Sequence, residues 1–153
     1  VVADAKNETA VQRVYKLKER SEHKSPIVLI SSKAQVFDEV PAEITTLLED
    51  VWPGPVSVII PSSKAPLWIR RGNDSVAYRL PNNLDLQQLI GQTGPLIAPS
   101  ANPEGKPPAM TIAEAEAYFG DGVDFYVDGG AVTNASPSQL LLVGNNGGVT
   151  RLR

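Results

Sequence analysis

The feature that most constrains the fold is an alternation of short apolar runs with longer amphipathic segments along the first two-thirds of the chain. Apolar runs at 26–30, 56–60 and 95–98 have the length of buried strands. Segments 7–20 and 41–51 repeat apolar residues near every 3.6 positions, as amphipathic helices do. Strands that alternate with helices place those helices on the faces of a sheet. The pattern therefore predicts an α/β or α+β domain, with a mixed sheet flanked by helices.

Capping residues and helix breakers mark several boundaries. Asn7 or Thr9 caps the first helix, Pro41 lies in the first turn of the second, and Thr111 caps a later one. The sequence Trp-Pro-Gly-Pro at 52–55 ends the second helix. The remaining predicted elements are strands at 75–80, 123–127, 139–143 and 148–152 and helices at 84–90, ending at Gly91 or Gly94, and at 111–119.

The 153 residues fit one domain over 1–153. The first residue is Val, and a helix follows almost at once, whereas α/β domains usually open with a strand. The expectation is that an N-terminal strand and loop belong to this domain but are not in the chain.

Composition removes several classes of function. There is no cysteine, which excludes disulfides and thiolate chemistry, and His23 is the only histidine, which argues against a histidine metal site. The net charge of −3 excludes a general nucleic-acid coat. No apolar run reaches the roughly 18 residues that cross a membrane, and no signal peptide is evident. We expect a cytoplasmic protein with no membrane partner and no metal ligands. Basic residues still cluster at 13–24 and at 70–71, so a local pocket for one polyanion remains possible.

Lys18 and Arg20 form the first candidate site. If the first helix ends near Lys18, Arg20 lies in the outgoing loop and both cations can converge on one phosphate group. The alternative is a solvated basic helix end that complements the helix dipole.

Ser100 and Asn102 form the second candidate site. They follow a predicted strand, where open α/β sheets bind ligands, and in extended chain they face the same side. A hydroxyl and an amide suit phosphate or ribose oxygens. The alternative is a polar turn between prolines.

Arg79 and the C-terminal residues Ser138 and Arg151 are weaker candidates. Arg79 ends an apolar strand and needs an anionic partner if it is buried, although alternation also allows it to face outward. The chain lacks the glycine-rich phosphate loop of P-loop proteins, the dinucleotide fingerprint and the Gly-x-Ser-x-Gly nucleophile motif. Any nucleotide would therefore be held by scattered side chains.

Taken in order, seven fragments resemble the YrdC-like threonylcarbamoyl-AMP synthase family. They are Leu-Lys-Glu-Arg at 17–20, Trp-Pro-Gly-Pro-Val-Ser-Val at 52–58, Val-Ala-Tyr-Arg-Leu-Pro at 76–81, Gly-Pro-Leu-Ile-Ala-Pro-Ser-Ala-Asn at 94–102, Val-Asp-Gly-Gly at 127–130, Pro-Ser at 137–138 and Thr-Arg-Leu-Arg at 150–153. The resemblance implies a twisted mixed sheet with a concave basic cavity. It also implies synthesis of threonylcarbamoyl-adenylate and pyrophosphate from L-threonine, bicarbonate and ATP, for modification of tRNA.

The resemblance also assigns roles to the candidate residues. Lys18 and Arg20 would hold the ATP phosphates, and Ser100 and Asn102 would also hold ATP. Arg79 would lie near the threonine carboxylate or the carbamate. Ser138 and Arg151 would contact the nucleotide. Mg²⁺ would accompany ATP, and the cations would neutralise charge as a carbamate oxygen attacks the α-phosphorus. Partners could extend to tRNA or proteins of a tRNA-modification complex.

The chain departs from the family pattern in three places. The family's first strand and its Pro-Thr-Glu-Thr-x-Tyr-Gly-Leu-like loop, part of the threonine pocket, are absent, so the chain as written is expected to bind nucleotide weakly or not to turn over. Glu19 and Ser21 replace a common Gly and Pro, and Gln139 replaces a usual Thr. Two alternatives stay open at this point: a non-catalytic RNA-binding module, and a carbamoyl-transfer accessory domain like the one in hydrogenase maturation proteins.

Overall fold

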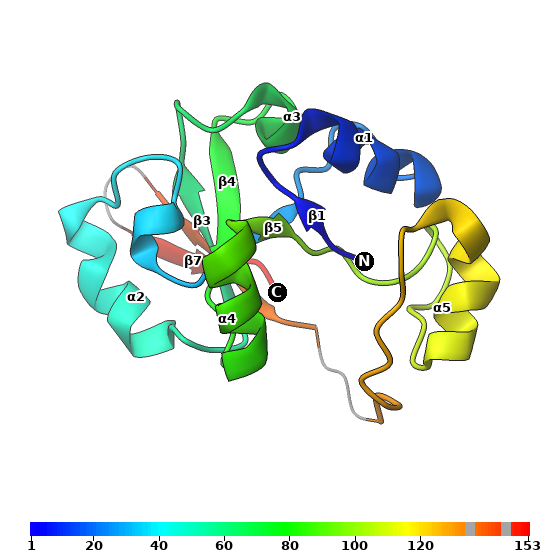
Figure 1. The fold of residues 1–153 in the computed structure, drawn as a ribbon. Coiled ribbons are helices and arrows are strands. Elements are labelled where there is room, and N and C mark those ends of the chain that lie inside the picture. The colour runs from blue at the N-terminus through cyan, green and yellow to red at the C-terminus, as the bar shows by residue number, and fades with distance from the viewer. Residues whose placement is uncertain (134–136, 145–147) are drawn as a thin grey trace.

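A mixed β-sheet runs through the computed structural model, which describes residues 1–133, 137–144 and 148–153 (Figure 1). Within the described residues, seven strands pair in the order β1-β5-β2-β4-β3-β6-β7. They are β1 (Ala3–Asp4), β2 (Ile27–Leu29), β3 (Val56–Pro61), β4 (Ser75–Arg79), β5 (Leu96–Ile97), β6 (Gln139–Val143) and β7 (Val149–Arg151). This sheet with its helices confirms the predicted fold class.

The predicted helices are present, with small changes at their ends. They are α1 (Glu8–Leu17), α2 (Thr45–Val51), α4 (Leu84–Thr93) and α5 (Ile112–Phe119); α2 is preceded by a 3₁₀ turn, Ala42–Ile44. Asn7, not Thr9, caps α1, because its side chain accepts a hydrogen bond from the Ala10 amide at 3.1 Å. Gly94, not Gly91, is the C-cap of α4. The short helix α3 (Leu67–Arg70) was not predicted, because four residues are too few to show a helical period.

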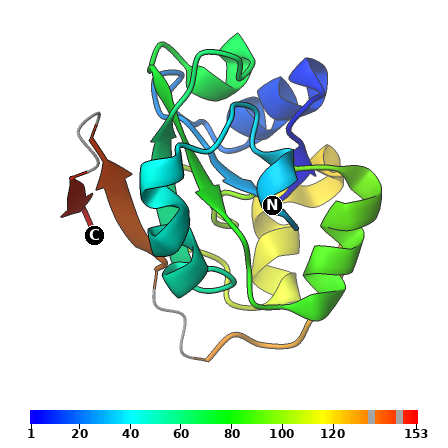
Figure 2. The ribbon, with the colours of Figure 1, turned by 90° about the vertical axis from the view of Figure 1, so that its left-hand side faces the viewer.

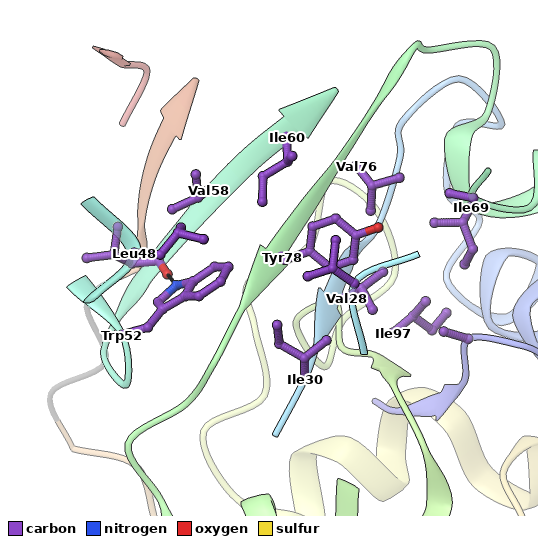
Figure 3. Close-up of a cluster of buried hydrophobic side chains, with 14 of the residues drawn as sticks. Val28, Ile30, Leu48, Trp52, Val58, Ile60, Ile69, Val76, Tyr78 and Ile97 are labelled. Atoms are coloured by element: carbon purple, nitrogen blue, oxygen red, sulfur yellow. Dashed lines mark hydrogen bonds between the residues drawn. The ribbon is translucent and has the colours of Figure 1, made fainter. Parts of the chain in front are cut away.

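Helices cover both faces of the sheet. Side chains of α1, α2 and α3 pack on one face, where alternate residues of β3 and β4, such as Val58 and Tyr78, are fully buried (Figure 3). On the other face, Ile90 of α4 packs against Leu29 and Leu96. Alternate strand residues point to opposite faces, so both helical layers bury apolar side chains of the same sheet.

The predicted strand at 123–127 is wrong. This segment follows α5 and runs beside it, at the far side of the molecule from β6 and β7 (Figures 1 and 2). Phe125 and Val127 are 78% and 76% exposed. The alternating sequence suits a strand, but no described strand lies beside the segment to supply ladder hydrogen bonds. Arg13 instead holds it from α1, donating to Gly122 O at 2.9 Å and pairing with Asp124 at 2.7 Å.

Strand directions decide which candidate residues can meet. Strand β5 is antiparallel to β2, so the chain that leaves β5 runs toward the start of β2 and the end of α1. Strands β2 and β4 are parallel, whereas β3 is antiparallel to β4 and parallel to β6. The end of β4 therefore lies beside the starts of β3 and β6. The topology thus creates two meeting points for polar side chains.

Among the residues that the structure describes, no helix is long and apolar enough to span a membrane.

Candidate functional site

The end of α1 releases Arg20 into a loop. Lys18 is the C-cap, and Glu19 adopts the left-handed conformation with φ 50°. The Arg20 amide donates to Tyr15 O at 3.0 Å and the Glu19 amide to Lys16 O at 3.2 Å, the two bonds of a Schellman motif. The condition under which Lys18 and Arg20 can converge is therefore met. The helix stops early enough for the two side chains to leave the same turn.

The Lys18 side chain ties α1 to the loop after β5. Lys18 is only 2% exposed. Its ammonium donates to the main-chain carbonyls of Ser100 and Asn102 and, at 3.3 Å, to Asn102 Oδ1. These acceptors match the three donors of an ammonium group. The first two candidate sites therefore form a single site.

Burial changes the charge state of this lysine. Burial of the ammonium lowers the pKa of Lys18 from 10.5 to about 8; repulsion from Arg20 adds to the effect, and Glu104 opposes it. A lysine with a pKa close to neutral pH gains from an anionic ligand, because the anion restores the preference for the charged form. Perturbed groups of this kind gather at functional sites more often than elsewhere.

Ser100 and Asn102 contact each other directly. Ser100 Oγ donates to Asn102 Oδ1 at 2.5 Å, and Asn102 Nδ2 donates to Pro103 O at 3.0 Å and Lys106 O at 2.7 Å. The amide thereby folds the 100–106 loop around itself. The two side chains are therefore in contact. The loop geometry brings them together, not the extended chain on which the prediction was based.

Glu104 joins the same loop to the residues after α1, a role that the sequence did not indicate. Its amide donates to Lys18 O at 2.6 Å, and its carboxylate accepts from the Ser21 amide at 2.6 Å and pairs with Lys24. The Lys24 and Ser21 hydrogen bonds lower the pKa of Glu104. Arg20 is close enough to contribute to that shift. Lys18, Arg20, Ser100, Asn102 and Glu104 are called the Lys18 group below.

A second cluster lies at the end of β4. Because Val58 pairs with Tyr78, the preceding residue Ser57 lies beside Arg79 on the face opposite the main core. The buried Ser57 and Ser138 hydroxyls are 3.2 Å apart. Arg153 Nε donates to Ser138 O at 3.0 Å. The residues Ser57, Arg79, Ser138 and Arg153 are called the Arg79 group.

Arg79 is a half-buried cation without a neutralising partner. Burial lowers the pKa of Arg79, and repulsion from Arg153 adds to the effect. In the described part of the chain, the Arg79 side chain makes no hydrogen bond or ion pair with another residue. A partly buried guanidinium beside a second one favours an incoming anion, since either charge is costly to bury alone.

The structure leaves Arg151 outside both groups. Arg151 is exposed on the edge strand β7, where it pairs with Leu141. Its side chain donates to Arg153 O at 3.2 Å. Arg153, which the sequence had not singled out, is the C-terminal arginine that lies near Arg79 and Ser138. Sequence reasoning also missed Ser57; the pairing of β3 with β4 was the missing information.

Two hollows stand out among the described residues. One, of about 420 Å³, lies between α1 and α5 and is lined mainly by apolar side chains. The other, of about 510 Å³, surrounds Asp38 and Ser62. None of the seven predicted site residues lines either hollow. The concave basic cavity expected from the resemblance is therefore neither of them.

Comparison with known proteins decides the family. A family model named Sua5_yciO_yrdC, described as "Telomere recombination", matches residues 1–153. The chain belongs to the Sua5/YciO/YrdC family. The threonylcarbamoyl-AMP synthase of Marinobacter nauticus is 33% identical over 144 residues, covering 90% of this chain and 76% of that protein. The synthase of Pseudomonas aeruginosa strain UCBPP-PA14 is 36% identical over 141 residues, with the same coverage.

Solved structures place the chain in the same family. A P. abyssi Sua5 structure in complex with L-threonine has a TM-score of 0.83 and 32% identity, covering 92% of this chain and 43% of that one. The H234A/Y235A variant of that Sua5 reaches a TM-score of 0.89 at 30% identity. This Sua5/YciO/YrdC chain spans 45% of the variant's length. A full-length HypF structure has a TM-score of 0.78 at 19% identity. A likeness at that identity shows a shared fold only, so it does not test whether this chain is a carbamoyl-transfer accessory domain.

Proposed function

We propose that this chain carries the catalytic core of a cytoplasmic L-threonylcarbamoyladenylate synthase. The observation that carries the proposal is the convergence of Lys18, Ser100 and Asn102, residues that match the family's phosphate-binding motifs, with Arg20 beside them. The family relatives bear the name threonylcarbamoyl-AMP synthase. ATP and L-threonine are the proposed substrates, with bicarbonate as the carbon source.

The Lys18 group suits the triphosphate. Arg20 has a planar guanidinium that can bind two phosphate oxygens, whereas Lys18 supplies a point charge. Lys18 must exchange at least one of its carbonyl acceptors for a phosphate oxygen, because those acceptors already match its donors. The Ser100 hydroxyl is exposed and can reach the ligand. Substrate binding would therefore proceed with a small rearrangement of the 100–106 loop.

The Arg79 group suits the carboxylate of threonine or of its carbamate. Two neighbouring guanidinium groups, Arg79 and Arg153, lie next to two buried hydroxyls. An anion there would offset both the burial of Arg79 and its repulsion from Arg153. In this proposal the carbamate oxygen attacks the α-phosphorus of ATP, the bond to the β-phosphate oxygen breaks, and pyrophosphate leaves. The protein contributes position and positive charge to that step.

Mg²⁺ is proposed to arrive with ATP. Over residues 1–133, 137–144 and 148–153, no group of three or more His, Cys, Asp or Glu side chains is placed to hold a metal ion. The phosphates themselves would carry the ion, as Mg²⁺ commonly binds through few protein ligands. The product would serve tRNA modification, with tRNA or its modification proteins as later partners.

Dependence on both co-substrates tests the proposal. The full-length protein is incubated with MgATP, and pyrophosphate release is measured with and without L-threonine and bicarbonate. The expected result is release only when both are present, with threonylcarbamoyl-AMP detected by mass spectrometry. ATP use that does not require threonine, or no release under any condition, contradicts it. RNA affinity that falls steeply with salt and ignores ATP would instead support an RNA-binding module.

A further inference from the structure

Arg71 stands where the backbone favours glycine. It is the C-cap of α3 and adopts the left-handed conformation with φ 52°. Such a conformation is unfavourable for a residue with a long side chain and persists where its surroundings enforce it. The Arg71 side chain is only 6% exposed. A buried arginine at a strained position indicates that the side chain has a specific task.

The Arg71 guanidinium is enclosed by three side chains. It lies over the Tyr15 ring, 3.7 Å from the centroid, which is close for a cation–π contact. One terminal nitrogen forms an ion pair with Glu22, and the other donates to Gln12 Oε1 at 3.3 Å. Tyr15 and Gln12 belong to α1, whereas Glu22 belongs to the loop that follows. Arg71 therefore fastens this loop to the helix from which it emerges.

Tyr15 makes the second attachment to the same loop. Its hydroxyl donates to Lys24 O at 2.5 Å. The Arg20 guanidinium lies 5.6 Å from the Tyr15 ring centroid. Arg20 also donates to Lys24 O at 3.3 Å and to Ser25 O at 3.1 Å. Tyr15 thus lies between Arg71 and the residues that orient Arg20.

We propose that Arg71 and Tyr15 form a clamp that holds the 18–25 loop so that Arg20 is already oriented when polyphosphate binds. The proposal rests on the proposed function and adds Arg71 as a positioning residue, because both of its terminal nitrogens are occupied by Glu22 and Gln12. Residues 18–26 contain no regular helix or strand to hold them. A loop that is ordered before binding spares the ligand the cost of ordering it.

Calorimetric titration of MgATP into wild-type protein and four variants tests the clamp. Arg71→Met keeps a long aliphatic side chain but removes the guanidinium that lies over Tyr15, and is expected to raise the Kd about tenfold. Arg71→Lys keeps the charge without the planar fork, so only part of the affinity should return. Arg13→Met breaks an exposed ion pair with Asp124 at the other side of α1 and is the matched control, with an unchanged Kd. The fourth variant, Tyr15→Phe, keeps the ring and loses the contact with Lys24, for an expected threefold rise.

A double variant separates positioning from a general loss of stability. If Arg71 acts through Arg20, adding Arg71→Met to an Arg20→Met protein changes the Kd by less than about twofold. Amide exchange of residues 21–24 should also become about tenfold faster in Arg71→Met. Independent, multiplying effects of the two substitutions overturn the clamp, as does a wild-type Kd with unchanged exchange.

The outcomes distinguish the clamp from the proposed function. Wild-type protein that fails to bind MgATP overturns the proposed function and the ligand role of the clamp together. Exchange at residues 21–24 then shows whether Arg71 holds the loop at all. If Arg71→Met does not fold, Tyr15→Phe decides: unchanged affinity and unchanged exchange in that variant overturn the clamp.

Discussion

The Lys18 group and the Arg79 group differ in how far their charges are neutralised within the protein. Lys18 has three oxygen acceptors, and Glu104 of the same group pairs with Lys24. Arg79 has no such partner in the described residues and lies near a second arginine. The Lys18 group is a connected network of hydrogen bonds and an ion pair, whereas the Arg79 group contains an unpaired positive charge. An anion must compete for donors at the first, whereas it relieves repulsion at the second.

Removing Lys18 should produce the largest effect, because structure and binding both depend on it. Lys18→Met leaves the carbonyls of Ser100 and Asn102 without their donor and is expected to reduce the free energy of unfolding by about 2–3 kcal/mol. The Kd for MgATP should rise about 100-fold. Urea unfolding and calorimetry measure the two quantities.

Lys16→Met is the control for this comparison. Lys16 lies in the last turn of α1 but is exposed, so both quantities should remain near wild type. A Lys18→Met protein of wild-type stability would show that the network does not join α1 to the loop after β5.

Removing Arg79 should separate binding from stability. Arg79→Met is expected to raise the Kd for threonine or ATP about 30-fold. The free energy of unfolding should stay unchanged or increase by about 1 kcal/mol, since burial of an unpaired charge and its repulsion from Arg153 both disappear. Calorimetry with each ligand alone shows which one Arg79 serves. A large loss of stability would mean that Arg79 has a partner in the folded protein and would remove the contrast between the groups.

The pH dependence of binding should report Lys18. Its pKa is about 8 in the folded protein and 10.5 as the ordinary value. Raising the pH through 8 removes the positive charge, so MgATP affinity should fall about tenfold between about pH 7 and 9. The unfolded chain holds this proton up to pH 10.5, so the same group makes the free energy of unfolding rise between pH 8 and 10.5. Titration of Lys18 should therefore make the MgATP affinity fall with rising pH while the free energy of unfolding rises. Lys18→Met should flatten the binding profile, and an unflattened profile would assign the titration to another group.

The smallest expected effect concerns the turn that releases Arg20. Glu19 occupies a left-handed position in the Schellman motif. Glu19→Gly should therefore increase the free energy of unfolding by about 1 kcal/mol, with little change in the Kd for MgATP. Glu116→Gly, in the interior of α5, is the matched control and should decrease stability by a similar amount. Thermal unfolding of both variants measures whether their stabilities change in opposite directions.

Local patterns were sufficient for most of the fold. The apolar run at 26–30, the Trp-Pro-Gly-Pro break and the Thr111 cap each depend on neighbours within a few residues, and all three are confirmed. The strand at 123–127 failed because alternation shows only that a segment can pair, not that a partner lies beside it.

In the candidate site, too, local features could be predicted from the sequence, whereas contacts between distant residues could not. Lys18, Arg20, Ser100 and Asn102 were identified from the sequence, since loops after strands and basic helix ends are local features. Their convergence on one ligand was expected from the family resemblance, and local patterns could not supply it, because Lys18 and Ser100 are separated by 82 positions and meet only through the antiparallel pairing of β5 with β2. Glu104, with no motif of its own, could be recognised only from its contacts.

The sequence by itself determined most of the elements, the absence of thiol chemistry and the residue types able to hold a polyphosphate, because these follow from composition and short-range periodicity. The tertiary structure decided which residues share a site: it joined Lys18 to Asn102, placed Arg153 beside Arg79, and enclosed Arg71 against Tyr15. Strand order and direction control contacts between distant residues, and they arise from the packing of the whole sheet, beyond any local segment.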